Sequence, residues 1–218
     1  SSFKHNAFRD STTGIAIVDL GTNSPPGTRI NLSIQHNVFE RLTSYGIHAA
    51  GAALYADDIS DNRFIGITKQ ANQLGAKAVG LAMDMFRVGK VRRNEFIGND
   101  YGVEITFPLY SSTITDSVAD FGVAGDLGNN VFRCNSERDG RAGDVLIVGQ
   151  AGQPNETWGG AFHLAGNAWD HLPPTFLTTD PPPNGVDISL RFAPNIVVDR
   201  ASSSLSSAIC PSGKVPGQ

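Results

Sequence analysis

One short motif recurs along this 218-residue chain: an asparagine, any residue, and then a large aromatic residue. Successive copies begin 31, 25, 32, 36 and 37 residues apart. The asparagines are Asn6, Asn37, Asn62, Asn94, Asn130 and Asn167, and the aromatic residues are Phe8, Phe39, Phe64, Phe96, Phe132 and Trp169. A repeat of this length is typical of stacked structural units, each too small to bury its own apolar residues.

The residues around each copy predict short β-strands. An apolar residue lies three positions before each asparagine, at Phe3, Ile34, Ile59, Val91, Leu127 and Leu164. A glycine followed by alternating apolar residues occurs at residues 14–17, 46–49, 80–83, 102–105 and 185–188. Alternation with period two, bounded by Gly or Asn, is a strand signal.

Stacking of the repeats would place like residues in columns. Parallel strands lie about 4.8 Å apart, so equivalent asparagines could bond to one another and equivalent aromatic rings could stack. His5 and His36 share another position of the repeat and are expected to stack as well. We expect each motif asparagine to take the left-handed backbone of a bend, a conformation that asparagine tolerates.

Two folds place strands about thirty residues apart, a parallel β-helix and a βαβ sheet. A βαβ sheet needs a helix in each interval, and only residues 70–86 have apolar residues at helical spacing. Gly75 and Gly80 would each weaken that helix by about 1 kcal/mol. The sequence therefore predicts an all-β solenoid.

The repeat resembles that of the right-handed parallel β-helix shared by pectate-lyase-like proteins. Residues 126–135, 144–147 and 165–174 are similar to the C-terminal coils of a bacterial and archaeal secreted β-helix family of undefined function. The resemblance implies a single-stranded, right-handed parallel β-helix of about six coils, matching the six motif copies. It implies no particular activity, because one scaffold can carry many functions.

The two ends of the chain differ in character. Residues 1–8 match the middle of a repeat, so we expect residues 1–192 to be a β-helix without its N-terminal coils or cap. Residues 193–218 are rich in Pro and Ser and are expected to form a tail that packs on the solenoid or on a partner. A polysaccharide or a protein partner is expected at the open first coil or at this tail.

The only two cysteines, Cys134 and Cys210, suggest a disulfide. A bridge would close a loop of about 75 residues and contribute on the order of 4 kcal/mol in the chain-entropy model. The alternative is two unpaired thiols, one of them buried. A bridge would predict an extracytoplasmic location, either secreted, periplasmic or on the cell surface.

Composition excludes several partners. The net charge of −4 is spread without blocks, which gives no reason to expect nucleic acid. No apolar run approaches the 18 or so residues that would cross a bilayer. No cofactor is predicted, and the histidines are too scattered for a zinc site, which needs three or four convergent ligands. Among metals, Ca²⁺ on loop carboxylates is favoured over Zn²⁺.

Asp57 and Asp58, with Asp61 close behind, form the densest acidic cluster. A second carboxylate on a neighbouring coil could complete the acid–base pair of a glycoside hydrolase. The candidates for that partner are Asp84, Asp100 and Glu104. The favoured alternative is that the three aspartates form turns beside Asn62.

Arg92 belongs to the densest basic cluster, residues 90–93. In the β-helix lyases that the chain resembles, an Arg or Lys removes a proton beside a uronate carboxyl group, often with Ca²⁺. Arg92 is expected to point outward if Val91 points inward. The favoured alternative is a solvated face on which Glu95 supplies a surface ion pair.

His48 and Glu104 occupy the same outward position of the glycine motif, two coils and roughly 9–10 Å apart. A bound sugar could span that distance. Trp158 and Tyr101 are candidates for stacking against sugars, although Trp158 is favoured as a packed anchor of its polar loop. The pair Asp170 and His171 is interpreted as structural.

Three functions remain open. The favoured one is a non-catalytic secreted or cell-surface scaffold that presents a binding surface, either alone or as a subunit of a larger assembly. The second is a polysaccharide lyase or glycoside hydrolase acting on an acidic polysaccharide, and the third is a carbohydrate-binding module. Three or more convergent charged groups about 5–10 Å apart would favour an enzyme.

Overall fold

The structure is a computed structural model that describes residues 1–18, 32–50, 55–70, 77–84, 87–106, 119–136, 143–149, 161–177, 186–191 and 197–211. For strand residues 55–57, 87, 88, 119 and 161, only the backbone is described. Every helix or strand within these ranges is a β-strand. The described residues accordingly include no helix of the length and apolar character that a membrane span requires.

The strands form three sheets. The first contains, in spatial order, β1 (Ser2–Lys4), β4 (Ser33–Gln35), β7 (Tyr55–Ser60), β10 (Arg87–Arg92), β13 (Ala119–Asp120), β16 (Ala161–His163) and β20 (Val197–Asp199). The second contains β2 (Ala7–Arg9), β5 (Val38–Glu40), β8 (Arg63–Ile65), β11 (Glu95–Ile97), β14 (Val131–Arg133), β17 (Ala168–Trp169) and β21 (Ser204–Leu205). The third contains β3 (Thr13–Val18), β6 (Tyr45–Ala50), β9 (Val79–Asp84), β12 (Tyr101–Thr106), β15 (Val145–Val148), β19 (Ile188–Arg191) and β18 (Phe176–Leu177).

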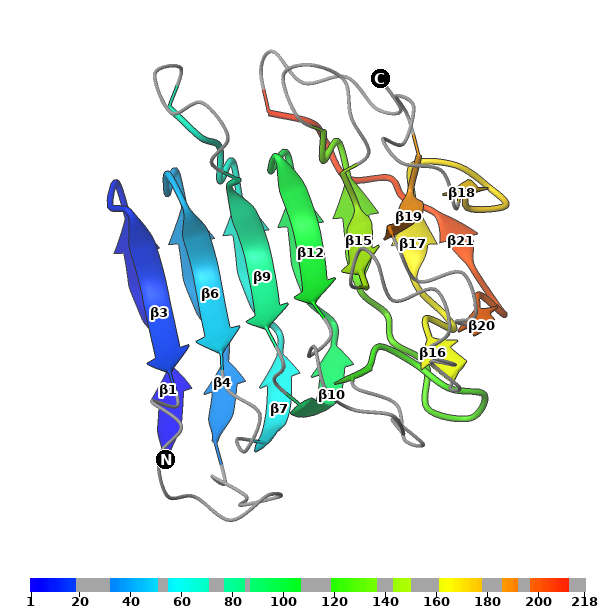
Figure 1. Cartoon of the computed structure of the whole chain (residues 1–218), viewed down its shortest axis with the longest axis horizontal. Helices are drawn as coiled ribbons and strands as arrows, with labels where there is room; N and C mark the ends of the chain where they lie inside the picture. The colour runs from blue at the N-terminus through cyan, green and yellow to red at the C-terminus, as the bar shows by residue number, and fades with distance from the viewer. Residues whose placement is uncertain are drawn as a thin grey trace.

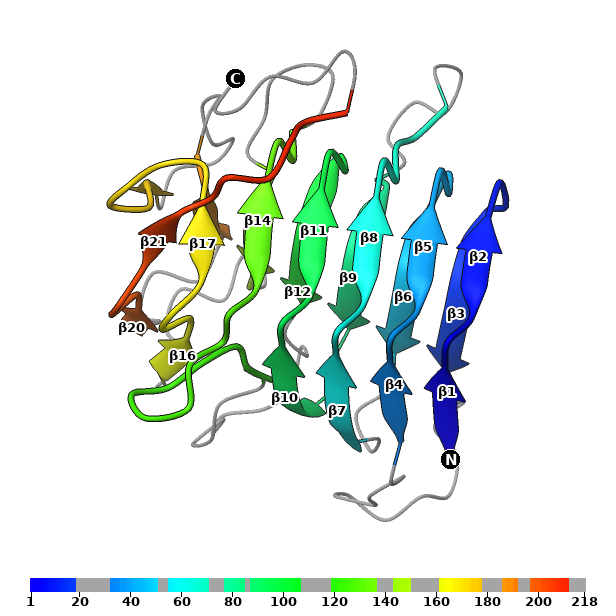
Figure 2. The same ribbon diagram turned by 180° about the vertical axis from the view of Figure 1, so that it is seen from behind.

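Apart from β18 and β19, which both belong to the third sheet, successive strands along the chain enter different sheets, so the coils stack side by side (Figures 1 and 2). Neighbouring strands within each sheet run parallel. This arrangement fits a parallel β-helix and confirms the all-β, parallel architecture predicted from the repeat. It excludes the βαβ alternative for the described residues, because residues 79–84 of the only candidate helix form strand β9.

The aromatic residues of the motif form one continuous stack through the core. From Phe8 to Trp169, neighbouring ring centroids are 4.7 to 5.0 Å apart and the rings are nearly parallel. Five of the six rings, from Phe39 onward, are fully buried. The spacing matches that of paired strands, because each ring belongs to a residue of a different strand of the second sheet.

The motif asparagines form a second column with a fixed direction. In each of the first five copies, the backbone N–H and Nδ2 donate to Oδ1 of the asparagine in the next coil, at 2.9 to 3.1 Å. Nδ2 also donates to a carbonyl of the first sheet, as from Asn62 to Ile34. Buried amides are therefore satisfied by one another.

The left-handed bend is made by the residue before the asparagine, so the expectation that asparagine itself adopts it was wrong. Residues 5, 36, 61, 93 and 129 have φ between 51° and 56°, and Gly166 has φ 74°. This turn aims the following asparagine inward, where its amide joins the column. His5 and His36 occupy the bend and stack with ring centroids 5.0 Å apart.

Two positions predicted from the repeat are shifted. Phe121, and not Leu127, fills the inward position of the fifth coil: Phe121 is fully buried while Leu127 is 38% exposed. Residues 122–128 instead form a turn closed by a bridge between Val123 and Asp126. This turn lengthens the interval before Asn130.

The last glycine motif is out of register by two residues. Ile188, and not Val186, pairs with Val145. Asp187 therefore takes the position that Gly102 fills two coils earlier. The alternation concealed this shift, because a slip of two residues keeps each side chain on the same face.

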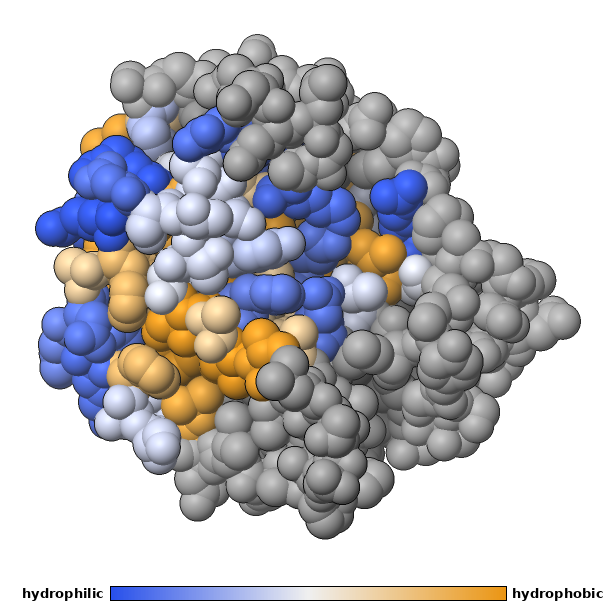
Figure 3. Space-filling model, turned by 60° about the vertical axis from the view of Figure 1, so that its left-hand side comes forward, coloured by the Kyte–Doolittle hydropathy of each residue, from blue (hydrophilic) through white to orange (hydrophobic). Residues whose placement is uncertain are grey.

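Paired strands continue beyond residue 192. Strand β20 extends the first sheet and β21 extends the second, with Leu205 paired to Trp169. Beyond β21, the chain turns back and the Cys134–Cys210 disulfide fixes it to the outer face of the second sheet. At the opposite end, the first coil exposes Phe3 and Val18, and Figure 3 shows hydrophobic surface beside hydrophilic surface on that side.

Candidate functional site

Four of the candidate residues meet on the outer face of the third sheet. Strand register places His48 and Glu104 in one outward row on either side of Ala82. Asp84 lies two residues after Ala82, in the next outward row. Tyr101 lies on β12, the strand that also carries Glu104. We call Tyr45, His48, Lys77, Asp84, Tyr101 and Glu104 the sheet-three cluster.

His48 and Asp84 form a hydrogen-bonded pair, with Nε2 3.0 Å from Oδ2. The bond from His48 holds the pKa of Asp84 below its usual value, against the opposing effect of burial. The ring of Tyr45 stacks on the His48 ring at 4.5 Å between centroids. This side of the cluster offers solvent a flat ring, an imidazole and an ionised carboxylate.

Lys77 and Glu104 form the second pair, with Nζ 2.5 Å from Oε1. Nζ also lies 5.9 Å from the centroid of the Tyr101 ring. Burial raises the pKa of Tyr45, and the carboxylates of Glu104 and Asp84 add to the shift. The cluster thus pairs each of its two carboxylates with a basic side chain, Asp84 with His48 and Glu104 with Lys77.

The pairs surround an apolar floor. Val79, Ala82, Tyr101 and Leu146 form a buried cluster on this outer face, distinct from the interior core. Lys77 was not predicted from the sequence, and Tyr45 was not selected among the aromatic residues that could stack against sugars. Tyr45 could have been found, because it stands directly before a motif glycine as Tyr101 does, and both residues pair with Val79.

The acidic candidates of β7 are not brought to this cluster. Asp58 lies on the first sheet, where it accepts hydrogen bonds from Gln35 and Ser60. Asp61 occupies the left-handed bend and pairs with Arg93 at 2.8 Å, which lowers the pKa of Asp61. The side chain of Asp57 lies outside the described residues. Asp58 and Asp61 therefore do not combine with Asp84 or Glu104.

Arg92 lies on the first sheet but is buried, so the interpretation of a solvated face was wrong for Arg92, whereas the side chains of Lys90 and Arg93 are exposed. Its side chain is 4% exposed and donates to Asp120 at 2.7 Å and to Asp126 at 3.2 Å. Glu95 pairs with Arg63 instead. The unexpected turn at residues 122–128 explains the difference, because it carries Asp126 back over β10. Lys90 and Arg92 together lower the pKa of Asp126 to about 2.

A group of buried carboxyls that was not predicted from the sequence lies beside the C-terminal strands of the third sheet. Asp144 and Asp187 fill the glycine position in successive coils and are both buried. Burial raises the pKa of Asp144 well above its usual value, and Asp187 and Asp170 add to the shift. Asp144 and Asp187 could have been recognised in the sequence, because each is an aspartate at the position where earlier coils have a glycine.

Asp170 and His171 do not bond to each other. Asp170 accepts the backbone N–H of Cys134 at 2.8 Å, whereas Nδ1 of His171 lies 3.1 Å from both carboxylate oxygens of Asp187. These contacts fix the closing turn.

Trp158 lies outside the described residues, and Tyr101 is only 6% exposed, which limits its use as a stacking surface. Within the described ranges, no three His, Cys, Asp or Glu side chains converge to hold a metal ion.

Comparison with known proteins adds a family but no activity. Residues 27–176, well over half of the chain, match a family model described as "Protein of unknown function (DUF1565)". No curated protein and no solved structure matches the chain.

Proposed function

Because the chain belongs to the DUF1565 family, whose description gives no activity, we propose a function from the geometry alone. The protein is a non-catalytic scaffold, a right-handed parallel β-helix of about six coils, one for each motif copy. It binds its ligand through the sheet-three cluster. The observation that carries this proposal is the mutual pairing of His48 with Asp84 and of Lys77 with Glu104.

The pairing argues against proton transfer by this cluster. A general acid that works near neutral pH needs a raised pKa and access to the substrate. Asp84 is accessible, at 40% side-chain exposure, but its pKa is lowered. Asp144 has a raised pKa but is buried. Neither Asp84 nor Asp144 therefore combines a raised pKa with access to the substrate.

The same pairing favours an uncharged ligand. An acidic polysaccharide would need cationic groups in excess, whereas Lys77 and His48 are each engaged by a carboxylate. A stacked tyrosine beside an imidazole and a carboxylate can instead contact the flat face of a sugar and bond to its hydroxyls. We therefore propose a hydroxyl-rich, uncharged glycan as the ligand of the cluster.

The disulfide supports a secreted, periplasmic or cell-surface location, since disulfides persist in oxidising compartments. In that setting the solenoid would act as a rigid support. The exposed first coil and the C-terminal segment would remain available for a protein partner.

Binding is tested by titrating the full chain with neutral oligosaccharides in a calorimeter, with uronate oligomers for comparison. We expect a neutral glycan to bind and Tyr45→Ala to weaken that binding at least about tenfold, equivalent to about 1.4 kcal/mol. The matched control is Arg63→Ala, which removes an exposed ion pair on the second sheet. Loss of binding in both variants, or binding of uronates alone, would contradict the proposal.

A glycoside hydrolase remains the second candidate, because a carboxylate at 3.0 Å could orient His48 as a base. Incubation with the bound glycan, followed by measurement of new reducing ends, separates the two functions. Turnover that disappears in His48→Ala would establish the enzyme and overturn the scaffold.

A further inference from the structure

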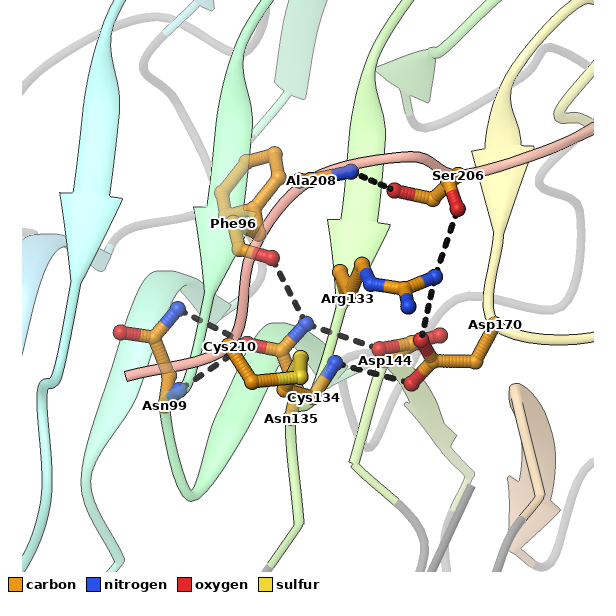
Figure 4. Close-up of a disulfide and its surroundings, with 10 residues drawn as sticks. All are labelled: Phe96, Asn99, Arg133, Cys134, Asn135, Asp144, Asp170, Ser206, Ala208 and Cys210. Carbon is orange, nitrogen blue, oxygen red and sulfur yellow. Dashed lines mark hydrogen bonds and ion pairs between the residues drawn. A yellow bond between two sulfur atoms is a disulfide. The ribbon is translucent and has the colours of Figure 1, made fainter. Parts of the chain in front are cut away.

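The chain after β21 crosses the outer face of the second sheet as a strap, defined here as residues 206–211. Figure 2 shows it running back from β21 over β17 and β14, and Figure 4 shows its attachment beside Arg133. The strap thus lies outside strands that are already paired with one another.

Within the part of the chain that the structure describes, the strap is held mainly at its two ends. At its start, the N–H of Ser206 donates to the carbonyl of Trp169 at 2.8 Å, and Arg133 donates to the carbonyl of Ser206. At its far end, Cys210 is bonded to Cys134, and the ring of Pro211 lies so close to Gly98 that an added Cβ would be 2.6 Å away.

Apolar burial contributes little to this attachment. Ile209 is the large apolar side chain of the strap, and it is 89% exposed. The strap residues also form no strand of the second sheet, since β21 ends at Leu205. Among the contacts within the described residues, the covalent bond is therefore the main restraint on residues 207–211.

The coils beneath do not depend on the strap for their pairing. Strands β11 and β14 pair in register over three residues, and the asparagine column and aromatic stack pass through both. These interactions are buried and remain in place if the strap leaves.

We infer that the Cys134–Cys210 disulfide is a redox latch. A dithiol reductant, such as a thioredoxin-type protein, opens it and releases the strap while the coils stay folded. Release uncovers the outer face of the second sheet around Gly98 and frees Arg133 from the carbonyl of Ser206. The latch concerns the second sheet and is independent of the proposed glycan site on the third.

The reaction is a thiol–disulfide exchange. Cys134 is buried whereas Cys210 is partly exposed, so a thiolate of the reductant attacks Sγ of Cys210. That attack forms a mixed disulfide, and Cys134 leaves as a thiolate that takes up a proton. The second thiol of the reductant then displaces Cys210. Two electrons pass from the dithiol to the protein disulfide, which becomes two thiols, while the reductant becomes a disulfide.

Hydrogen exchange with mass spectrometry tests the latch on the full chain, with and without dithiothreitol. The amide of Ser206 donates to Trp169 and that of Ala208 donates to Oγ of Ser206. We expect these two amides to exchange at least about tenfold faster after reduction, as local opening requires. Amides of β11 and β14 should keep their protection. Cys210→Ser should show the reduced pattern without dithiothreitol, and the double variant Cys134→Ser/Cys210→Ser should not respond to it.

Two results would overturn the inference. If β11 and β14 lose protection together with the strap, the disulfide holds the whole fold and is not a local latch. If the strap stays protected after complete reduction, confirmed by alkylation of both thiols, its non-covalent contacts suffice. Reduction of the folded wild-type chain decides between these outcomes even if Cys210→Ser fails to fold.

Discussion

The asparagine column should contribute most to stability at its centre, and Asn94→Ala is the perturbation that measures this. Asn94 accepts bonds from the backbone N–H and Nδ2 of Asn62, each at 3.0 Å. It also donates from Nδ2 to the carbonyl of Ile59 at 2.9 Å. Alanine removes these three bonds and also the bond from Nδ2 to Oδ1 of Asn130, which still accepts the backbone N–H of residue 94.

Each buried donor or acceptor left unpaired costs about 1–3 kcal/mol. Nδ2 of Asn62 keeps a second bond, to Ile34, which reduces its share. We therefore expect Asn94→Ala to lower the free energy of unfolding by about 3–6 kcal/mol. That is a large part of the 5–15 kcal/mol typical of a domain.

Asn6→Ala is the matched control, because Asn6 ends the column and is exposed to water. Its Nδ2 donates to Asn37 and to the carbonyl of Lys4. Oδ1 of Asn37 still accepts the backbone N–H of residue 6 at 3.0 Å after the change. Water can replace the remaining bonds, so the loss should not exceed about 1 kcal/mol.

Urea unfolding followed by circular dichroism gives both free energies. An equal loss of stability in the two variants would refute this expectation, because burial would then make no difference to the contribution of these bonds. A changed slope of the unfolding free energy against urea would instead indicate partial unfolding of neighbouring coils.

Two further predictions concern charged groups. Arg92→Ala should destabilise the fold by about 3 kcal/mol, since it removes a buried guanidinium from Asp120 and Asp126. The control Arg63→Ala should change the free energy of unfolding by no more than about 1 kcal/mol. Equal urea midpoints for the two variants would contradict this prediction. The raised pKa of Asp144 means that its protonated form stabilises the fold, so that stability falls as pH rises from about 4 toward the folded pKa. Asp144→Asn keeps an acceptor for Asn135 and should gain stability over the wild type across that range, measured as urea midpoints from pH 4 to 8; a constant difference would argue against the shift.

The repeat predicted much of the fold because each of its positions has one physical role. A motif asparagine or phenylalanine recurs where the same bond or stack recurs, so its spacing alone indicates parallel coils. The prediction failed where the chain departs from the repeat, as at Leu127. There a turn of seven residues, 122–128, replaced the expected strand position, and no local signal distinguished Leu127 from Phe121 as the inward residue.

The candidate site was less predictable, because charged residues have no periodic signature. His48 and Glu104 were placed in one row by counting along the repeat, and the register agrees. The residues that pair with His48 and Glu104 could not be found by counting along the repeat. Asp84 reaches His48 from the directly paired strand, whereas Asp126 reaches Arg92 only because of the turn at residues 122–128.

The sequence by itself determined the stacked, all-β architecture, because the pattern of inward apolar residues, asparagines and aromatic rings can be satisfied only by coils paired in parallel. The tertiary structure alone decided which charges are buried, which acids and bases pair, and where the strap runs. These depend on side chains that meet across coils from positions outside the repeat, and sequence spacing carries no information about such meetings.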